Sequence, residues 1–231
     1  MNYELTKRYE RQLILPEIGE KGQERLAAAR VLIVGVGGLG SPIAIYLAGA
    51  GVGTIGMVDD DVVSISNLQR QVLYEEAQVG MSKVLCARQR LQALNSEITV
   101  LAYNERLNAA NARELFSQYD IVVDGTDNFP TRYIISDVCA ELGKPYVYGA
   151  ICGLEGQVAV LCKGKATYRT LFPDRGMPQQ GKQVVGVTPA IVGSVEASQV
   201  LQLVCGYGEP LVDRIWTIDL RTMQSFTIDI Q

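Results

Sequence analysis

The sequence predicts an α/β protein with a doubly wound, mostly parallel sheet and an antiparallel C-terminal extension. Short apolar runs alternate with stretches of helical spacing, which is typical of parallel strands joined by helices. A glycine-rich turn follows the first apolar run, and two alternating stretches close the chain. Because crossovers between parallel strands are right-handed, helices should cover both faces of the sheet. No linker divides residues 1–231, so we expect a single domain.

The expected strands begin with RVLIV at 30–34, a continuous apolar run that indicates a strand buried on both faces. Further apolar runs predict strands over 53–59, 97–102, 120–125, 146–151 and 157–162. Residues 214–220 and 224–230 alternate on either side of a short turn, and they predict an antiparallel hairpin.

The expected helices are placed by apolar spacing and by caps. Pro42 suits the first turn of a helix that follows the glycines, and Asn108 suits the N-cap of a helix that reaches Tyr119. Gly206 is a stop signal for a helix over 188–204. Other helical stretches are 4–29 (one or two short helices), 81–95 and 130–142. The domain therefore divides into a helical lead-in (1–29), a core (30–162), a mobile crossover loop (163–187) and a helix with a hairpin (188–231).

Composition predicts a soluble protein of the cytoplasm. Hydrophobic residues make up 48% and charged residues 20% of the 231 residues, as in ordinary globular enzymes. The net charge of −4 gives no general attraction for nucleic acid. The polar N-terminus is not a secretory signal, and no apolar run reaches the length of a membrane span. We therefore expect neither nucleic acid nor a membrane among the partners.

Five cysteines and the absence of histidine limit the chemistry. The odd number of cysteines and the lack of any CxxC pair argue against a disulfide framework and a four-thiolate zinc site. We interpret the thiols as buried small side chains: Cys86, Cys139, Cys152, Cys162 and Cys205. Without histidine, Ser-His-Asp and Cys-His hydrolases are excluded, and any mechanism must work without an imidazole base.

The glycine-rich turn predicts a nucleotide site. Gly35, Gly37, Gly38 and Gly40 follow a strand and precede a helix, so the backbone can approach phosphates at a helix N-terminus. Asp59 ends the next strand, where an acid can hold ribose hydroxyls. This pattern is that of a Rossmann-like fold, and it does not by itself choose between NAD and ATP.

The polar run that follows favours a triphosphate over a nicotinamide. Asn67, Arg70 and Gln71 lie in this run, and Lys83 begins the next helical stretch. Two cations and an amide near a phosphate-binding loop suit a triphosphate, whereas a nicotinamide ring needs an apolar slot. On local sequence alone, a solvated charged loop is the favoured explanation of a run this rich in polar residues.

Together with further motifs along the chain, these residues resemble the ThiF/MoeB/HesA family of sulfur-carrier adenylyltransferases, bacterial relatives of the ubiquitin-activating enzymes. The resemblance is collinear over roughly the first 205 residues, so a chance match is improbable. The matching motifs are RYERQLILPEIG at 8–19, VLIVGVGGLGSP at 31–42, VDDDVVSISNLQRQ at 58–71, VGMSKV at 79–84, GTDNFPTRY at 125–133, KPYVYGAICGLEGQV at 144–158 and TPAIVG at 188–193.

The resemblance implies ATP-dependent adenylation of the C-terminal carboxylate of a small ubiquitin-like carrier, with release of pyrophosphate. It implies that the four glycines, Gln71, Asn67, Arg70 and Lys83 contact the nucleotide, and that Asp59 binds its ribose. It also implies that Asp127 holds Mg²⁺, and that Arg11 reaches the ATP of the other subunit in a homodimer. Locally, Asp127 could instead cap a helix, and Arg11 could be a surface charge.

The implied chemistry is consistent with a chain that lacks histidine. A C-terminal carboxylate has a pKa of about 3.5, so it is already ionised at neutral pH and needs no general base. The difficult part is bringing one anion onto the α-phosphorus of another, and cations offset that repulsion.

Two departures from the family pattern lead to further expectations. Many relatives bind zinc through two CxxC pairs, but Thr167 and Thr170 stand at the first pair, so we expect no zinc. Some relatives carry a loop cysteine that joins the carrier, and the matching position falls near Gly181 in a stretch (163–204) without cysteine. We therefore expect a separate sulfurtransferase. We also expect the basic loop to contact the carrier's tail through Lys163, Lys165, Arg169, Arg175 and Lys182.

Several alternatives stay open. The carrier could serve thiazole formation for thiamine, which we favour because the chain is short and simple, or molybdopterin formation. From other classes, the chain could be an NAD-dependent oxidoreductase or a module that binds ATP and carrier without turnover. A relative acting on tRNA would be expected to show a basic surface, which the net charge does not support.

Overall fold

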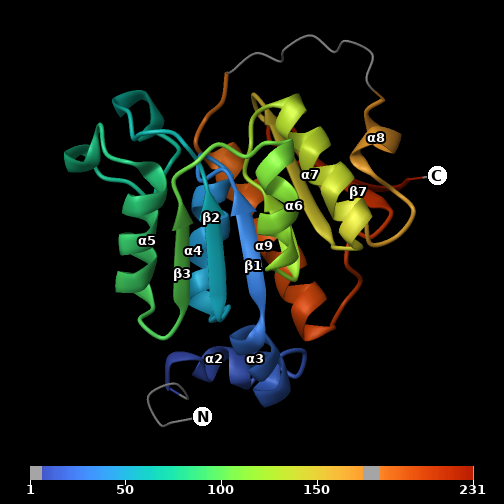
Figure 1. Ribbon diagram of the computed structural model, residues 1–231. Coiled ribbons are helices and arrows are strands. Elements are labelled where there is room, and N and C mark those ends of the chain that lie inside the picture. The colour runs from blue at the N-terminus through green and yellow to red at the C-terminus, as the bar shows by residue number, and fades with distance from the viewer. Residues whose placement is uncertain (1–6, 174–182, 231) are drawn as a thin grey trace.

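The computed structural model describes residues 7–173 and 183–230 and shows one sheet with helices on both faces (Figure 1). The sheet has eight strands in the order β3-β2-β1-β4-β5-β6-β7-β8. The strands are β1 (Arg30–Val34), β2 (Thr54–Val58), β3 (Thr99–Tyr103), β4 (Ile121–Asp124), β5 (Tyr146–Cys152), β6 (Glu155–Leu161), β7 (Arg214–Asp219) and β8 (Gln224–Asp229). The first five run parallel, and the last three are antiparallel to their neighbours. The predicted fold class is confirmed.

The helices form two layers over the sheet. They are α2 (Glu10–Leu13), α3 (Gly19–Ala28), α4 (Gly40–Ala50), α5 (Lys83–Leu94), α6 (Ala109–Ser117), α7 (Phe129–Leu142), α8 (Tyr168–Leu171) and α9 (Val187–Cys205), with 3-10 turns η1 (Ile65–Asn67) and η2 (Glu76–Gln78). One core packs α3, α4, α5 and α9 on one face, and the other packs α6, α7 and α8 on the opposite face (Figure 1). This is the doubly wound arrangement.

The element predictions hold to within a few residues, with two differences. Strand β6 begins at Glu155, because its pairing with β5 continues through a tight turn to the Cys152–Glu155 pair. The short helix α8 lies inside the stretch predicted as a loop, and Thr167 and Thr170 stabilise it by bonding each other's backbone N–H groups. The expectations for Arg175, Gly181 and Lys182 lie outside the described residues.

Caps fix two helices of the second layer. The Asn108 side chain accepts from the N–H groups of Ala110 and Asn111, as the sequence predicts. Helix α7 is capped by Asn128, whose Oδ1 accepts from Thr131 N at 3.0 Å. The cap is therefore the neighbour of Asp127, so the Asp127 carboxylate is not needed to end this helix.

The C-terminal hairpin is anchored by one carboxylate. Asp213 accepts from the backbone N–H groups of Lys165 and Ala166 at 2.7–3.0 Å, and these bonds lower its pKa. They tie the start of β7 to the turn before α8. Strand β7 continues the sheet next to β6, and Trp216 packs against the first core. Packing and hydrogen bonds thus hold this end of the chain.

Helix α9 is long and apolar enough to cross a membrane by length and composition, contrary to expectation. In the folded chain it is a core helix: Val192 and Val200 are fully buried against the sheet, and its contacts reach α4, β5 and β6. Glu196 is the exception on this apolar helix. Its side chain is fully buried beside Gly149 of β5, and neither carboxyl oxygen has a hydrogen-bond partner among residues 7–173 and 183–230.

Burial raises the pKa of Glu196 well above its ordinary value of 4.5, and the nearby Asp124 raises it further, although Arg132 opposes the shift. In the unfolded chain Glu196 ionises near 4.5, whereas the folded protein retains the proton to a higher pH. The unfolded state therefore loses a proton that the folded state keeps. This group removes stability as pH rises above about 4.5, up to the folded pKa.

We expect Glu196→Gln, which cannot ionise, to gain stability over the wild type as pH rises from 5 to 8. The gain should approach about 1.4 kcal/mol per pH unit as an upper bound. Urea unfolding at several pH values measures it, and the exposed Glu97→Gln is the matched control. A pH-independent difference between Glu196→Gln and the wild type would contradict this assignment.

Candidate functional site

A cleft of about 990 Å³ opens at the carboxyl ends of β1, β2 and β4, and it reaches the loop after β3. Ligands of open parallel sheets bind at this edge, where the strand order reverses between β1 and β4. The cleft brings together most of the sequence-predicted site residues: Gly35, Gly37, Gly38, Asp59, Asn67, Arg70, Gln71, Lys83 and Asp127. Residues far apart in the chain therefore form one site.

The glycine turn depends on close packing of backbone. Gly35 has φ +85°, and its carbonyl oxygen lies against both Gly40 and Gly125. A Cβ at Gly40 or at Gly125 would overlap that oxygen. Gly40 is buried and does not line the cleft, whereas Gly37 and Gly38 do. Gly40 thus contributes close packing between strand and helix rather than a wall of the site.

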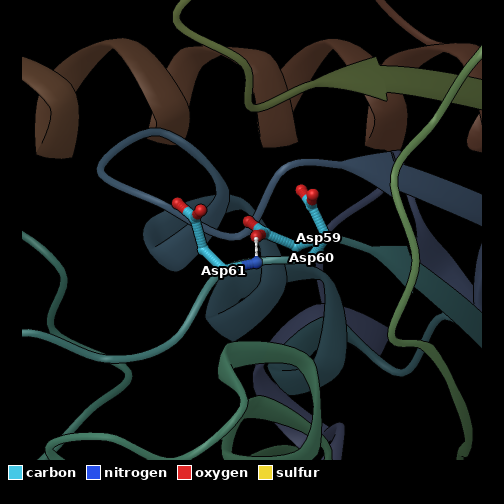
Figure 2. A group of neighbouring side chains, drawn as sticks. All are labelled: Asp59, Asp60 and Asp61. Atoms are coloured by element: carbon cyan, nitrogen blue, oxygen red, sulfur yellow. Dashed lines mark hydrogen bonds between the residues drawn. The ribbon is translucent and has the colours of Figure 1, made fainter.

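The acidic run after β2 places three carboxylates within 4.8 Å of one another, on Asp59, Asp60 and Asp61 (Figure 2). Asp59 Oδ2 accepts from Val36 N, and Oδ1 accepts from Asp61 N, both at 2.8 Å. Burial raises the pKa of Asp59, while these two N–H groups and Lys83 lower it. Asp59 therefore joins the end of β2 to the glycine turn and also borders the cleft.

Each of the two predicted cations of the site is held by a neighbouring oxygen. Lys83 is almost fully buried, and its Nζ lies 2.8 Å from Asp61 Oδ2. Arg70 donates from Nη1 to the Ser66 carbonyl at 3.0 Å, which uses one guanidinium nitrogen, and the side chain borders the cleft. Asn67 accepts from Ser64 N through Oδ1, so its amide N–H groups stay available.

Two further polar side chains border the cleft with acceptor oxygens that no described residue satisfies. Gln71 is 4% exposed, and its buried Oε1 has no hydrogen-bond partner in the described part of the chain. Asp127 is exposed on the loop before α7, and its carboxylate makes no hydrogen bond or ion pair with the residues that the structure describes. A buried acceptor without a partner is costly unless a ligand or water satisfies it.

Arg11 lies at the opposite edge of the sheet. Helix α2 sits beside α3, below the amino end of β1, whereas the cleft lies at the carboxyl ends (Figure 1). The Arg11 side chain is exposed there. It therefore does not take part in the cleft of its own chain.

A buried ion pair that the sequence motifs did not predict lies at the wall of the cleft, which Arg132 lines. Arg132 donates to Asp124 Oδ2 at 3.0 Å and to the carbonyls of Thr126 and Gly149, and Asp124 also accepts from Thr126 and Tyr146. Both charged side chains are at least nine-tenths buried. The acid at the end of the apolar run IVVD, and the arginine in GTDNFPTRY, were the available signals.

The arrangement can bind an extended polyanion. Its lining combines glycines of the turn that precedes α4, the cations Arg70 and Lys83, and the exposed carboxylate of Asp127. Arg106, on the loop after β3, adds another cation to the lining that sequence analysis did not single out. A nucleoside triphosphate has this charge and length.

Comparison with known proteins identifies similar chains. The ThiF family profile matches residues 9–231. A sulfur carrier protein adenylyltransferase of Thermus thermophilus is 48% identical, over 92% of this chain and 82% of its own length. A probable adenylyltransferase/sulfurtransferase MoeZ of Mycobacterium tuberculosis is 44% identical over the whole chain, which spans 62% of that protein. An adenylyltransferase and sulfurtransferase MOCS3-1 of Zea mays is 45% identical, and this chain spans 47% of the length of that protein.

Solved structures show the same fold. Selenomethionine PaaA is 26% identical, with a TM-score of 0.86 over all of this chain and 75% of that one. Escherichia coli MccB with ATP is 24% identical, with a TM-score of 0.78 over 91% of this chain and 65% of that one. At such identity MccB supports the fold alone.

We expect Gly40→Ala to abolish nucleotide binding and to destabilise the protein, because the new Cβ meets the fixed Gly35 carbonyl. The matched control is Gly49→Ala in the same helix, where a Cβ meets nothing within 4 Å. That change should stabilise the chain by roughly 0.5–1 kcal/mol, because alanine favours helix. Thermal unfolding and calorimetric ATP titration measure both variants, and equal behaviour of the two would refute the packing argument.

Proposed function

The chain belongs to the ThiF family, and we propose that it uses ATP to adenylate the C-terminal carboxylate of a small ubiquitin-like sulfur-carrier protein, releasing pyrophosphate. The observation that carries the proposal is the meeting of the glycine turn, Arg70, Lys83 and Asp127 in one cleft. The names of the relatives, which describe sulfur-carrier adenylyltransferases, support the same chemistry.

In the proposed reaction a carboxylate oxygen of the carrier attacks the α-phosphorus of ATP. A P–O bond forms to the acyl oxygen, the bond to the β-phosphate breaks, and pyrophosphate leaves with its electron pair. No proton transfer is needed, because the carboxylate is already ionised. The role of the site is to position both anions and to neutralise their charge, which Arg70 and Lys83 do from one side of the cleft.

The nucleotide is proposed to lie across the cleft from Asp59 to Asp127. Asp59 binds the ribose, the glycine turn binds the phosphates, and Asn67 and Gln71 supply amide groups beside them. Gln71 Oε1, buried and without a partner, would accept a hydrogen bond from the nucleotide. In this site a nicotinamide ring would face cations rather than the apolar slot it requires, which disfavours the NAD alternative.

Asp127 is proposed to hold Mg²⁺. Its carboxylate is exposed, borders the cleft and is not required as a helix cap, and oxygen ligands suit this hard cation. When bound, the ion would neutralise charge on the phosphates. Arg132 and Asp124 would hold the loop that carries Asp127 in place from below.

Arg11 is proposed to complete the site of a second copy in a homodimer. It lies at the far edge of its own sheet, so only another chain could bring it to a cleft. Exposed apolar side chains next to it, Ile14 and Leu15, and others on the segment after β2, Ile65 and Val72, suit a subunit interface. In solution the protein is therefore proposed to be a dimer with two composite sites.

Sulfur transfer is proposed to be the task of a separate sulfurtransferase, because residues 163–204 contain no cysteine. No structural zinc is proposed, since Thr167 and Thr170 cap α8 instead. The carriers of thiamine and of molybdopterin synthesis both fit the proposal, with the cytoplasm as the location. Carrier-dependent ATP–pyrophosphate exchange with each carrier decides between them, and calorimetry with Mg·ATP and NAD tests the ligand. Binding of NAD without ATP would overturn the proposal.

We expect Asp127→Asn to lower the kcat of carrier-dependent exchange by about 100-fold or more, because the neutral amide is a poor ligand for Mg²⁺. The melting temperature should not change, since Asp127 makes no internal contact among the described residues. Asp229→Asn on strand β8, far from the cleft along the sheet, is the control. Retained exchange activity in Asp127→Asn would remove this residue from the mechanism.

We expect Arg11→Ala and Lys83→Ala to be inactive alone and to complement each other when mixed and allowed to exchange subunits. A mixed dimer has one site with both cations intact, so about a quarter of all sites should recover. Exchange activity before and after mixing measures this. If Arg11 served its own chain's site, mixing would restore nothing.

A further inference from the structure

One residue of the glycine turn, Val36, has both backbone polar groups held by side chains. Asp59 Oδ2 accepts from Val36 N at 2.8 Å, and the Tyr74 hydroxyl donates to Val36 O at 2.6 Å. Tyr74 is 7% exposed and is not part of the cleft lining. It therefore acts on the turn from beneath, where no ligand reaches it.

The tyrosine contact fixes the direction of the next N–H group. The peptide between Val36 and Gly37 is trans and planar, so its C=O and N–H point in opposite directions. Because the Val36 oxygen points to Tyr74, the Gly37 N–H points away from Tyr74. Gly37 borders the cleft, and within residues 7–173 and 183–230 its N–H has no hydrogen-bond partner.

The following peptide is held in the same way. The Gly37 carbonyl accepts from Ser41 N at 3.0 Å and from Ser41 Oγ at 2.7 Å, so the Gly38 N–H points away from helix α4. Gly38 also borders the cleft, and its N–H has no partner in the described part of the chain. Two successive carbonyls are thus held from inside, and two successive N–H groups are left for a ligand.

We propose that Tyr74 is a positioning residue for the nucleotide phosphates, because its hydroxyl holds the Val36 carbonyl and so aims the Gly37 N–H into the cleft. The inference rests on the proposed function, in which a triphosphate occupies the glycine turn. A donor that is already aligned does not have to reorganise when an anion binds. Burial raises the pKa of Tyr74, and Asp59 raises it further, so the hydroxyl remains a donor at all working pH values.

The test is Tyr74→Phe, which removes one oxygen atom and keeps the ring. The probes are inorganic tripolyphosphate, adenosine and ATP, measured by calorimetry, together with exchange kinetics. We expect Tyr74→Phe to weaken tripolyphosphate binding and to raise the KM for ATP by a common factor of about tenfold. Adenosine affinity and kcat should stay within about twofold of the wild type. Tyr103→Phe, which loses a hydroxyl paired with Tyr119 outside the cleft, is the control and should change neither.

Ser41→Ala removes one of the two hydrogen bonds to the Gly37 carbonyl. It should also weaken tripolyphosphate binding and raise the KM for ATP, by a smaller factor than Tyr74→Phe does. The inference is overturned if tripolyphosphate affinity is unchanged in Tyr74→Phe, or if adenosine affinity falls by the same factor, which would indicate a general loss of structure. If the wild type binds tripolyphosphate but shows no carrier-dependent exchange, the proposed function fails. The tripolyphosphate affinities of Tyr74→Phe and the wild type still test the role of Tyr74 in that case.

Discussion

The site depends on a close approach of backbone at the ends of β1 and β4. The Gly35 carbonyl lies against Gly40 and Gly125 with no room for a side chain on either. This contact joins the first strand, the helix that follows it and the fourth strand, and so it defines the switch point where the cleft opens. The glycine turn, the acidic end of β2 and the loop that carries Asp127 are all placed relative to it.

Buried polar bonds then fix the direction of each group around this contact. Asp59 and Tyr74 hold the two sides of Val36, and Arg132 ties Asp124 to the Thr126 carbonyl. Such bonds contribute little net stability, but breaking one leaves a buried partner unsatisfied, so they specify a single geometry. A site that must hold two anions at a defined distance benefits from this rigidity.

Helix α9 links the cleft to the C-terminal half of the fold. Its first turn places Pro189 against Gly38, its middle places Gly193 against Pro42, and Glu196 lies over β5 beside Gly149. The segment just before it carries Gln183 and Val184 into the cleft wall. Helix α9 therefore packs against the glycine turn and against α4, and the segment before it forms part of the cleft wall.

The sequence by itself determined the order of strands and helices, because apolar runs, caps and glycines act locally and leave a periodic record. It also named a set of polar residues and glycines that meet in the cleft, since the motifs that carry them lie at strand ends, and strand ends meet at one edge of a parallel sheet. Tertiary structure alone decided which of these groups are packed, capping or paired within the protein and which remain available to a ligand. It made Gly40 a packing residue, gave the cap of α7 to Asn128, and paired Lys83 with Asp61. It also brought Arg132 to Asp124, and Tyr74 to Val36 across 38 residues. These contacts join positions whose separation in the chain carries no periodic signal, so only the folded chain can show them.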